Sequence, residues 1–366
     1  MGLPTIILGK STDRRVFDLY NALSKRYNTL IWDNYSASTT SILYPKACHW
    51  KCQKLSDVLK LVELNPVTDY VWLPLVEDEI EWLLSNATIP TNLKYLLPAK
   101  INFSEANDKK KFTQKFEQAG LTPRSFSISE LAASFPVEGV VVKPRICKGA
   151  VGRYYLTTPG KLPDHMDDMV IQERLRDGKN VIGSFVIAQN GIVIKHYQHR
   201  RIRTFPSKGG VSVYAETVQI SAVRQATEEI IKKMHWSGLC MLEFLQDQHG
   251  RYKAIECNPR IWGSVLLDEF SGNHLVDAYI MLCLDKEVQV KPILPHARIK
   301  WLLPYEFFHI IARPWSIFEF KSSVGKNTCY VGFTYSSLIR SILFILLNIF
   351  SRAKWVTLFK KIVKSS

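Results

Sequence analysis

The sequence has none of the features that mark secreted or membrane-spanning proteins. Its seven cysteines are scattered and odd in number, which argues against a secreted disulfide framework. The first apolar run ends at Leu8 and Lys10 follows it almost at once, so we predict no signal peptide. Hydrophobic residues make up 46% of the chain and charged residues 22%, as in an ordinary globular protein. We therefore expect a folded protein of a reducing cytoplasm.

Two kinds of binding site are also missing. Cys48 and Cys52 could supply half of a zinc site, but no second Cys/His pair stands at zinc spacing. No G-x-G-x-x-G motif follows Gly9, so the N-terminal unit is predicted to pack without a dinucleotide. The net charge of +15 attracts anions of several kinds, but aromatic residues do not interleave with the basic ones. We therefore expect no nucleic acid as a partner.

Short apolar strands alternate with amphipathic helices in residues 1–100. We predict strands over 4–9, 29–32 and 70–75, and helices over 13–26 and 77–84. This alternation predicts a parallel α/β domain.

Residues 101–300 show a different pattern of predicted helices and strands. A predicted helix over 109–119 stops at Gly120, and three pairs of alternating strands follow: 139–143 with 153–157, 182–189 with 192–197, and 239–246 with 251–258. The second pair encloses Asn190-Gly191, a strong hairpin signal. The fold class predicted for the whole chain is therefore α/β plus α+β, with antiparallel sheets and helices in the second domain.

Two glutamates face each other in the third hairpin. If its turn is centred on residues 249–250, Glu243 and Glu256 lie directly opposite; a four-residue loop would make them diagonal neighbours on the same face. Like charges opposed among apolar residues are costly unless a cation lies between them. The amide oxygen of Asn258 points to the same face. These three oxygen ligands predict a Mg²⁺ site that also holds phosphate oxygens.

Basic residues precede that hairpin. Lys143 ends a buried apolar run, where a cation suits a phosphate contact, although a strand that simply ends at the surface is an open alternative. Lys148 begins the small loop 148–152, whose backbone N–H groups can cover phosphates. If 199–203 is extended, His199, Arg201 and Arg203 share one face, and the arginine pair can bind a carboxylate or phosphate. A solvated basic edge strand is the alternative.

The order of these motifs resembles the ATP-grasp superfamily over about residues 4–290. The resemblance rests on Asp108-Lys109, Gly120, Val-Val-Val-Lys143-Pro, Val-Ile-Gln-Glu173-Arg-Leu, Glu243 and Glu256-Cys-Asn258-Pro-Arg260. It is to the carboxylate–amine ligase-like members, related to biotin carboxylase and D-alanine–D-alanine ligase. The 199–210 segment also looks like a subgroup of predicted ATP-grasp carboligases. By this resemblance residues 1–100 are the pre-ATP-grasp domain and residues 101–300 the ATP-grasp domain.

The resemblance implies a role for each matching residue. The ATP phosphates would contact Lys109, Lys143 and Lys148. The adenine-binding hinge would be formed by Gln172, Glu173, Arg174 and Leu175. Two Mg²⁺ ions, or Mn²⁺ in their place, would be held by Glu243, Glu256 and Asn258. The catalytic cations would be Lys143 and Arg260, and the acceptor site would be lined by Arg201 and Arg203.

The implied activity is that of an ADP-forming ligase. Such an enzyme activates a carboxylate as an acyl phosphate and passes it to a nucleophile, most often an amine. The substrates would be a small-molecule or glycan-linked carboxylate and an amine. A carboxylase-like enzyme that activates bicarbonate is the first alternative. A non-catalytic ATP-binding module is the second, because the 148–152 loop holds little glycine.

The C-terminal region, residues 301–366, is basic and apolar. It holds nine Lys/Arg against two Glu, and its uncharged run 341–351 lies between Arg340 and Arg352. Eleven helical residues span roughly 16 Å, well short of the roughly 30 Å hydrocarbon core of a bilayer. A basic amphipathic helix over 354–364 would suit an anionic membrane surface, on the inner face of a membrane. The alternative is that 342–350 packs as a core helix.

Overall fold

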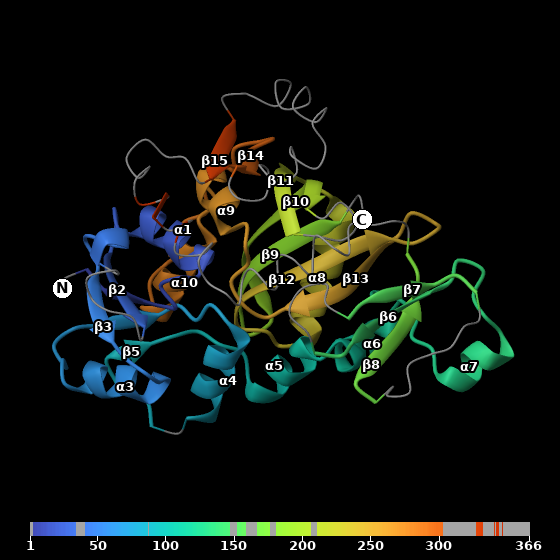
Figure 1. Ribbon diagram of the computed structural model, residues 1–366, viewed down its shortest axis with the longest axis horizontal. Coiled ribbons are helices and arrows are strands. Elements are labelled where there is room, and N and C mark those ends of the chain that lie inside the picture. Colours follow the sequence, from blue (N-terminus) through green and yellow to red (C-terminus); the bar gives the residue numbers. More distant parts are fainter. Residues whose placement is uncertain are drawn as a thin grey trace.

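The computed structural model describes residues 3–33, 41–86, 88–146, 152–158, 167–175, 181–205, 211–302, 327–331, 340, 342, 343 and 346. Their strands form sheets of five, seven and three strands (Figure 1). The five-stranded sheet is N-terminal, the seven-stranded sheet lies in the middle, and the small sheet lies at the far end of the molecule (Figure 1).

The N-terminal sheet is parallel throughout, in the order β3-β2-β1-β4-β5. Its strands are β1 (Thr5–Gly9), β2 (Asn28–Asp33), β3 (Cys48–Lys51), β4 (Tyr70–Trp72) and β5 (Leu93–Lys94). The helices between them are α1 (Arg14–Leu23), α3 (Leu55–Glu63) and α4 (Glu77–Ser85). The predicted parallel α/β unit is confirmed, although the strand expected over 70–75 ends at Trp72.

Both faces of the N-terminal sheet are covered, so β1 is buried along its whole length. The helices α3 and α4 pack on one face. On the other face, α1 packs together with α10 (Leu275–Cys283), a helix that lies about 250 residues later in the sequence. The hydroxyl of Tyr279 on α10 donates to the carbonyl of Trp72 at 2.9 Å. This shared core fixes the N-terminal domain against the rest of the molecule.

The central sheet has the order β13-β12-β9-β10-β11-β14-β15 and is antiparallel except for its last pair. Its strands are β9 (Ile182–Gln189), β10 (Ile192–Phe205), β11 (Val211–Val218), β12 (Gly238–Gln246), β13 (Tyr252–Asn258), β14 (Arg298–Trp301) and β15 (Thr328–Val331). One face packs on α5 (Lys100–Asn107), α6 (Lys109–Glu117) and α8 (Ser221–Lys233). The other meets α9 (Val265–Ser271), α10 and the N-terminal domain.

The small sheet, in the order β7-β6-β8, is antiparallel. It consists of β6 (Val140–Pro144), β7 (Tyr154–Leu156) and β8 (Met169–Glu173), and it packs on α7 (Ile128–Ala133). All three predicted strand pairs are therefore present. In the β9–β10 turn both Asn190 and Gly191 have positive φ, 51° and 80°, as a two-residue type I′ hairpin requires.

The C-terminal region is only partly within the described residues. Thr328–Val331 extends the central sheet as β15, so this part of the region pairs with the second domain. Arg340 donates to the carbonyl of Leu43 at 3.4 Å, and Leu343 packs against the main core. The predicted basic helix over 354–364 lies outside the described residues. Among the residues that are described, no helix is both long enough and apolar enough to cross a membrane.

Candidate functional site

A pair of carboxylates lies at the centre of the site. Glu243 on β12 and Glu256 on β13 are direct partners across the hairpin, which confirms the predicted facing pair. The pairing of residues nearer the turn, however, differs from the expected register. Toward the turn, Phe244 pairs with Ala254, so Ile255 is one extra residue and forms a β-bulge. The bulge takes Ile255 out of the ladder and brings the two glutamates into line.

Two lysines approach this pair from other elements. Lys109, the first residue of α6, places Nζ 3.7 Å from Oε2 of Glu256. Lys143 on β6 donates from Nζ to the carbonyl of Ile255, at 2.8 Å. Burial acts to raise the pKa of Glu256, but the charges of Lys109 and Lys143, together with the hydrogen bond from Asn258 and the charge of Arg201, lower it. Burial raises the pKa of Glu243. The pair is therefore electrostatically asymmetric.

The start of α6 is fastened to the end of β6, which places both lysines on the same side of the carboxylates. Asp108 caps α6 by accepting from the backbone N–H groups of Lys110 and Lys111, at 2.9 and 3.3 Å. Its carboxylate is also paired with Arg145 at 2.5 Å. The backbone N–H of Lys109 donates to the carbonyl of Arg145, at 3.0 Å.

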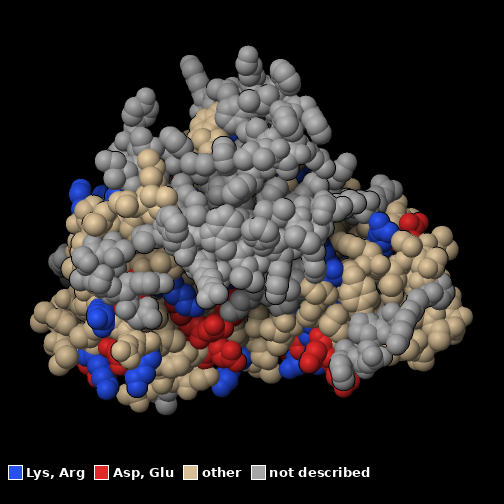
Figure 2. Space-filling model, viewed as in Figure 1, with Lys and Arg blue, Asp and Glu red and all other residues tan. Residues whose placement is uncertain are grey.

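Asn258 and Arg260 continue the site beyond β13. The amide of Asn258 donates to Oε1 of Glu256 at 3.2 Å, and its oxygen accepts from Nη2 of Arg260, also at 3.2 Å. Arg260 is held from the other side by Glu77, with Nε 2.6 Å from Oε1. Figure 2 shows acidic side chains gathered over α4, whose first turn begins at Glu77. Arg260 thus connects the central sheet to the N-terminal domain.

The structure places Arg201 at the carboxylates. Its guanidinium forms an ion pair with Glu243, although β9 lies between their two strands. Gly183 on β9 is the direct neighbour of Glu243 and has no side chain to obstruct the contact. Arg201 would therefore act on Glu243 as well as on any acceptor.

Arg203 and His199 do not join Arg201 there. Bulges on both sides of Arg203 break the alternation expected of an extended segment, and its partner is Tyr214 on β11. His199 is 2% exposed, and burial lowers its pKa to about 3, so the imidazole is neutral at pH 7. Its Nδ1 lies 3.3 Å from the hydroxyl of Ser264. His199 belongs to the core under the site and supplies no cation.

Replacing Gly183 by alanine is expected to destabilise the protein. A Cβ on Gly183 would lie 2.6 Å from the ring of Phe185 and 2.8 Å from Nε2 of His199, and both rings are fully packed. Overpacking of this kind costs about 1–3 kcal/mol of unfolding free energy. Urea denaturation measures it, with Gly263→Ala as the matched control, because a Cβ there meets nothing within 4 Å. Equal stability of the two variants would contradict this account.

The predicted adenine hinge lies at the end of β8. Gln172 is fully buried and donates to the hydroxyl of Thr113 at 2.5 Å, while its side-chain oxygen has no hydrogen-bond partner among the described residues. The backbone N–H of Glu173 donates to the carbonyl of Arg124 at 2.9 Å, and Oε1 of Glu173 accepts from the N–H of Arg124 at 3.2 Å. The role of this hinge remains a prediction.

The other two hinge residues flank the small sheet. Arg174 lies over the ring of Tyr155, with 5.4 Å to the centroid, and Leu175 is buried. Lys148 falls outside the described residues.

The donor set around the glutamates fits Mg²⁺. Within the described part of the chain, no three His, Cys, Asp or Glu side chains gather as a metal site. A cation would therefore rely on two facing carboxylates and the amide oxygen of Asn258. Mg²⁺ is commonly held by one or two carboxylates, with phosphate oxygens and water completing its shell.

Two contributions to the site were missed in the sequence. Gly183 carries a usable signal, because glycine inside a strand often marks a close approach of other groups. Glu77 gives no such signal in the sequence, because it lies 183 positions from Arg260 and acidic residues are common at the start of a helix.

Parts of the chain are similar to known protein families and solved structures. Residues 106–264 match a family model described as an ATP-grasp domain. No curated protein sequence matches the chain. N5-carboxyaminoimidazole ribonucleotide synthetase from Thermotoga maritima is 12% identical, with a TM-score of 0.55, over 80% of this chain and 79% of that one.

Two carboxylases have similar structures. The biotin carboxylase domain of Hydrogenobacter thermophilus 2-oxoglutarate carboxylase, in complex with MgADP, ADP and bicarbonate, is 13% identical (TM-score 0.60; 81% of this chain, 74% of that one). Rhizobium etli pyruvate carboxylase is 14% identical (TM-score 0.59), and the match covers 80% of this chain but only 29% of that one. The chain therefore contains an ATP-grasp domain over residues 106–264, and its fold is similar to those of N5-carboxyaminoimidazole ribonucleotide synthetase and biotin carboxylase.

Proposed function

We propose that the chain is an ADP-forming ligase that activates a carboxylate as an acyl phosphate and joins it to an amine. Enzymes of the ATP-grasp family are ADP-forming, ATP-dependent ligases that bind ATP with Mg²⁺. The observation that carries the proposal is the Glu243–Glu256 pair, with Lys109 and Lys143 directed at it and Arg260 beside it. Facing carboxylates surrounded by cations suit a phosphate-bound metal better than a structural role.

Each residue has a distinct task in this proposal. Glu243, Glu256 and Asn258 would hold Mg²⁺, which when bound neutralises charge on the phosphate oxygens; Mn²⁺ suits the same oxygen ligands. Lys109 and Lys143 would bind the phosphates directly. Positioning and charge stabilisation account for most of the catalysis in phosphoryl transfer, so no nucleophilic side chain is required.

The reaction balances in two steps. A carboxylate oxygen of the substrate attacks the γ-phosphorus of ATP, the bond to the β-phosphate oxygen breaks, and ADP leaves. Arg260 would stabilise the charge of the transferring group or orient the carboxylate. The amine then attacks the acyl carbon, phosphate leaves and the amine loses a proton, which gives the amide.

A screen of ADP release tests the proposal. Carboxylates are tested in pairs with amino acids and sugar amines, with Mg²⁺ present, by a coupled assay for ADP. We expect ADP release that requires both an acid and an amine. ATP binding without ADP release across the whole panel would overturn it in favour of a non-catalytic module.

Bicarbonate activation is the second candidate. Two of the similar structures are carboxylases by name, and one of them is a complex with bicarbonate. ADP release that depends on bicarbonate and needs no amine would favour bicarbonate activation over amide formation.

Arg201 and Arg203, both on β10, are expected to behave differently. Because Arg201 is paired with Glu243, Arg201→Ala should change the Mg²⁺ concentration needed for half-maximal ADP release. Arg203→Ala should raise the KM of an acidic co-substrate, by about tenfold for one lost charge-assisted contact, and leave the Mg²⁺ dependence unchanged. Steady-state kinetics with Mg²⁺ and the acid varied in turn measure both effects. Identical profiles for the two variants would contradict the separation of their roles.

A further inference from the structure

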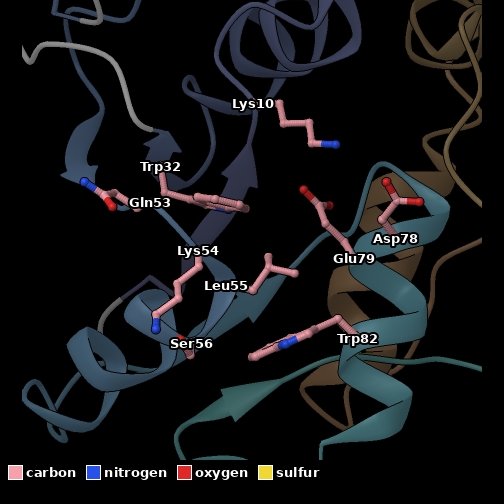
Figure 3. Close-up of a pocket in the computed structure, with 9 residues that line it drawn as sticks. All are labelled: Lys10, Trp32, Gln53, Lys54, Leu55, Ser56, Asp78, Glu79 and Trp82. Atoms are coloured by element: carbon pink, nitrogen blue, oxygen red, sulfur yellow. The ribbon is translucent and has the colours of Figure 1, made fainter.

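We propose that the N-terminal domain holds a second binding site, for a hydroxylated ring with an anionic substituent, such as a sugar acid or a sugar phosphate. The site is a pocket of about 300 Å³ between α3 and α4, beside the carboxyl ends of β1 and β2 (Figure 3). It lies outside residues 106–264, and none of the paired glutamates, lysines or arginines described above lines it. The residues that carry the argument are Lys10, Trp32, Leu55, Glu79 and Trp82.

Two buried polar atoms in this pocket are unsatisfied. Glu79 is 1% exposed and Trp32 is 7% exposed. Oε2 of Glu79 accepts from the backbone N–H of Leu75 at 2.8 Å. Oε1 of Glu79 and Nε1 of Trp32, however, have no hydrogen-bond partner within the described part of the chain. Because buried polar groups almost always have a partner, a ligand group is the natural complement.

The two atoms converge on one place. A Cβ on Gly9 would lie 2.5 Å from Oε1 of Glu79 and 2.8 Å from Nε1 of Trp32, so only glycine lets both side chains approach there. Figure 3 shows the carboxylate of Glu79 directed into the space between Trp32 and Lys10. One hydroxyl group both donates and accepts, so it can donate to Glu79 and accept from the indole N–H.

The rest of the lining defines the ligand further. Trp32, Leu55 and Trp82 provide apolar surface for the body of a small ring, and pockets of this size commonly combine such walls with a few polar groups. Lys10 adds a cation whose charge acts on Glu79. Burial raises the pKa of Glu79 to about 7, which leaves this carboxyl partly protonated at neutral pH and weakens its attraction for an ammonium group. Lys54 adds a second cation to the lining and Asp78 one carboxylate, so with Glu79 partly protonated the balance of charge favours an anionic substituent over a cationic amine.

A dinucleotide does not fit this part of the fold. Asp13 accepts from the backbone N–H of Arg15 at 2.8 Å and is paired with its guanidinium at 2.6 Å. The N-terminus of α1, where a pyrophosphate would bind in a dinucleotide fold, therefore already holds a carboxylate. The ligand is correspondingly small.

The pocket is connected to the proposed ligase site through one turn of helix. Glu77 holds Arg260, and Glu79, two residues later on α4, reaches into the pocket. The binding inference does not depend on ligase activity, however, and it is tested without ATP.

Calorimetry on the full chain provides the test, with glucuronate, glucose 6-phosphate, glucose and glucosamine as separate probes. We expect saturable binding of glucuronate or glucose 6-phosphate, with glucose at least fivefold weaker. The two anionic probes distinguish a sugar acid from a sugar phosphate. Trp32→Phe keeps an aromatic side chain but removes the indole N–H donor and should weaken binding about tenfold; Glu79→Gln should weaken it about fivefold. Lys10→Met should remove the preference for the anionic probes.

The matched control is Trp236→Phe. Trp236 is also fully buried with an Nε1 that lacks a partner among the described residues, but it lies in a different core. It should bind the probes as the unmodified chain does, and thermal melting reports the folding of every variant. No saturable binding of any probe, equal binding by the Trp32 and Trp236 variants, or a preference for glucosamine would each overturn the proposal.

Discussion

Replacing Glu256 by glutamine is expected to lower Mg²⁺-dependent ADP release by about 10²–10³-fold, the size of effect seen when one preorganised electrostatic group is removed from an active site. Lys109 and Lys143 lower the pKa of Glu256 against the effect of burial, so the side chain is ionised at neutral pH. Glutamine keeps the shape and removes the charge that faces Glu243. A coupled ADP assay with Mg²⁺ titrated measures the loss.

The fold should tolerate this change. Two opposed carboxylates destabilise a strand pair by about 0.2–1 kcal/mol, but the lowered pKa of Glu256 means that its charge also stabilises the folded protein at neutral pH. The two effects oppose each other, so removal of the charge should lower the unfolding free energy only slightly. Glu228→Gln is the control, because Glu228 is a half-exposed helical residue outside the site, and its ion pair with Arg224, at 2.8 Å, lies at the surface. Normal turnover of the Glu256 variant, or an equal loss in the control, would rule out the metal role.

The site hairpin could be predicted because it is built from local signals. Alternating strands on either side of His249 and Gly250 limit the pairing of Glu243 and Glu256 to two neighbouring registers. The Ile255 bulge could not be predicted, since an extra residue on one strand leaves no clear mark in the sequence. Next to the turn the strands pair one residue out of the expected register, and the bulge at Ile255 restores the expected register at the two glutamates.

Contacts between segments far apart in the chain could not be predicted from the sequence. The Glu77–Arg260 pair depends on how α4 packs beside the central sheet, and the Arg201–Glu243 pair depends on the strand order β12-β9-β10. Strand order in an antiparallel sheet follows from which apolar faces pack together, and a single sequence does not reveal that. Resemblance supplied the hinge and the phosphate loop instead, and these remain predictions.

Lys143→Met is expected to lower turnover by about a hundredfold and to weaken ATP binding, with little change in stability. Lys143 is 8% exposed, and its ammonium donates to the carbonyl of the bulged residue Ile255, at 2.8 Å. Its loss removes one hydrogen bond, worth about 1–3 kcal/mol for a charged donor, but it also removes a costly buried charge. ADP release and ATP titration measure the functional effect, and urea denaturation measures stability.

Lys253→Met is a closely matched control for this prediction. Lys253 lies on β13, is also 8% exposed, and donates to the carbonyl of Gly120 at 2.5 Å. Both variants remove a buried ammonium that donates to a backbone carbonyl, but only Lys143 adds its charge to those acting on Glu256. We expect similar shifts in unfolding free energy for the two variants, and a large loss of activity for Lys143→Met alone. Parallel losses of activity would mean that Lys143 acts through packing, and its phosphate role would be withdrawn.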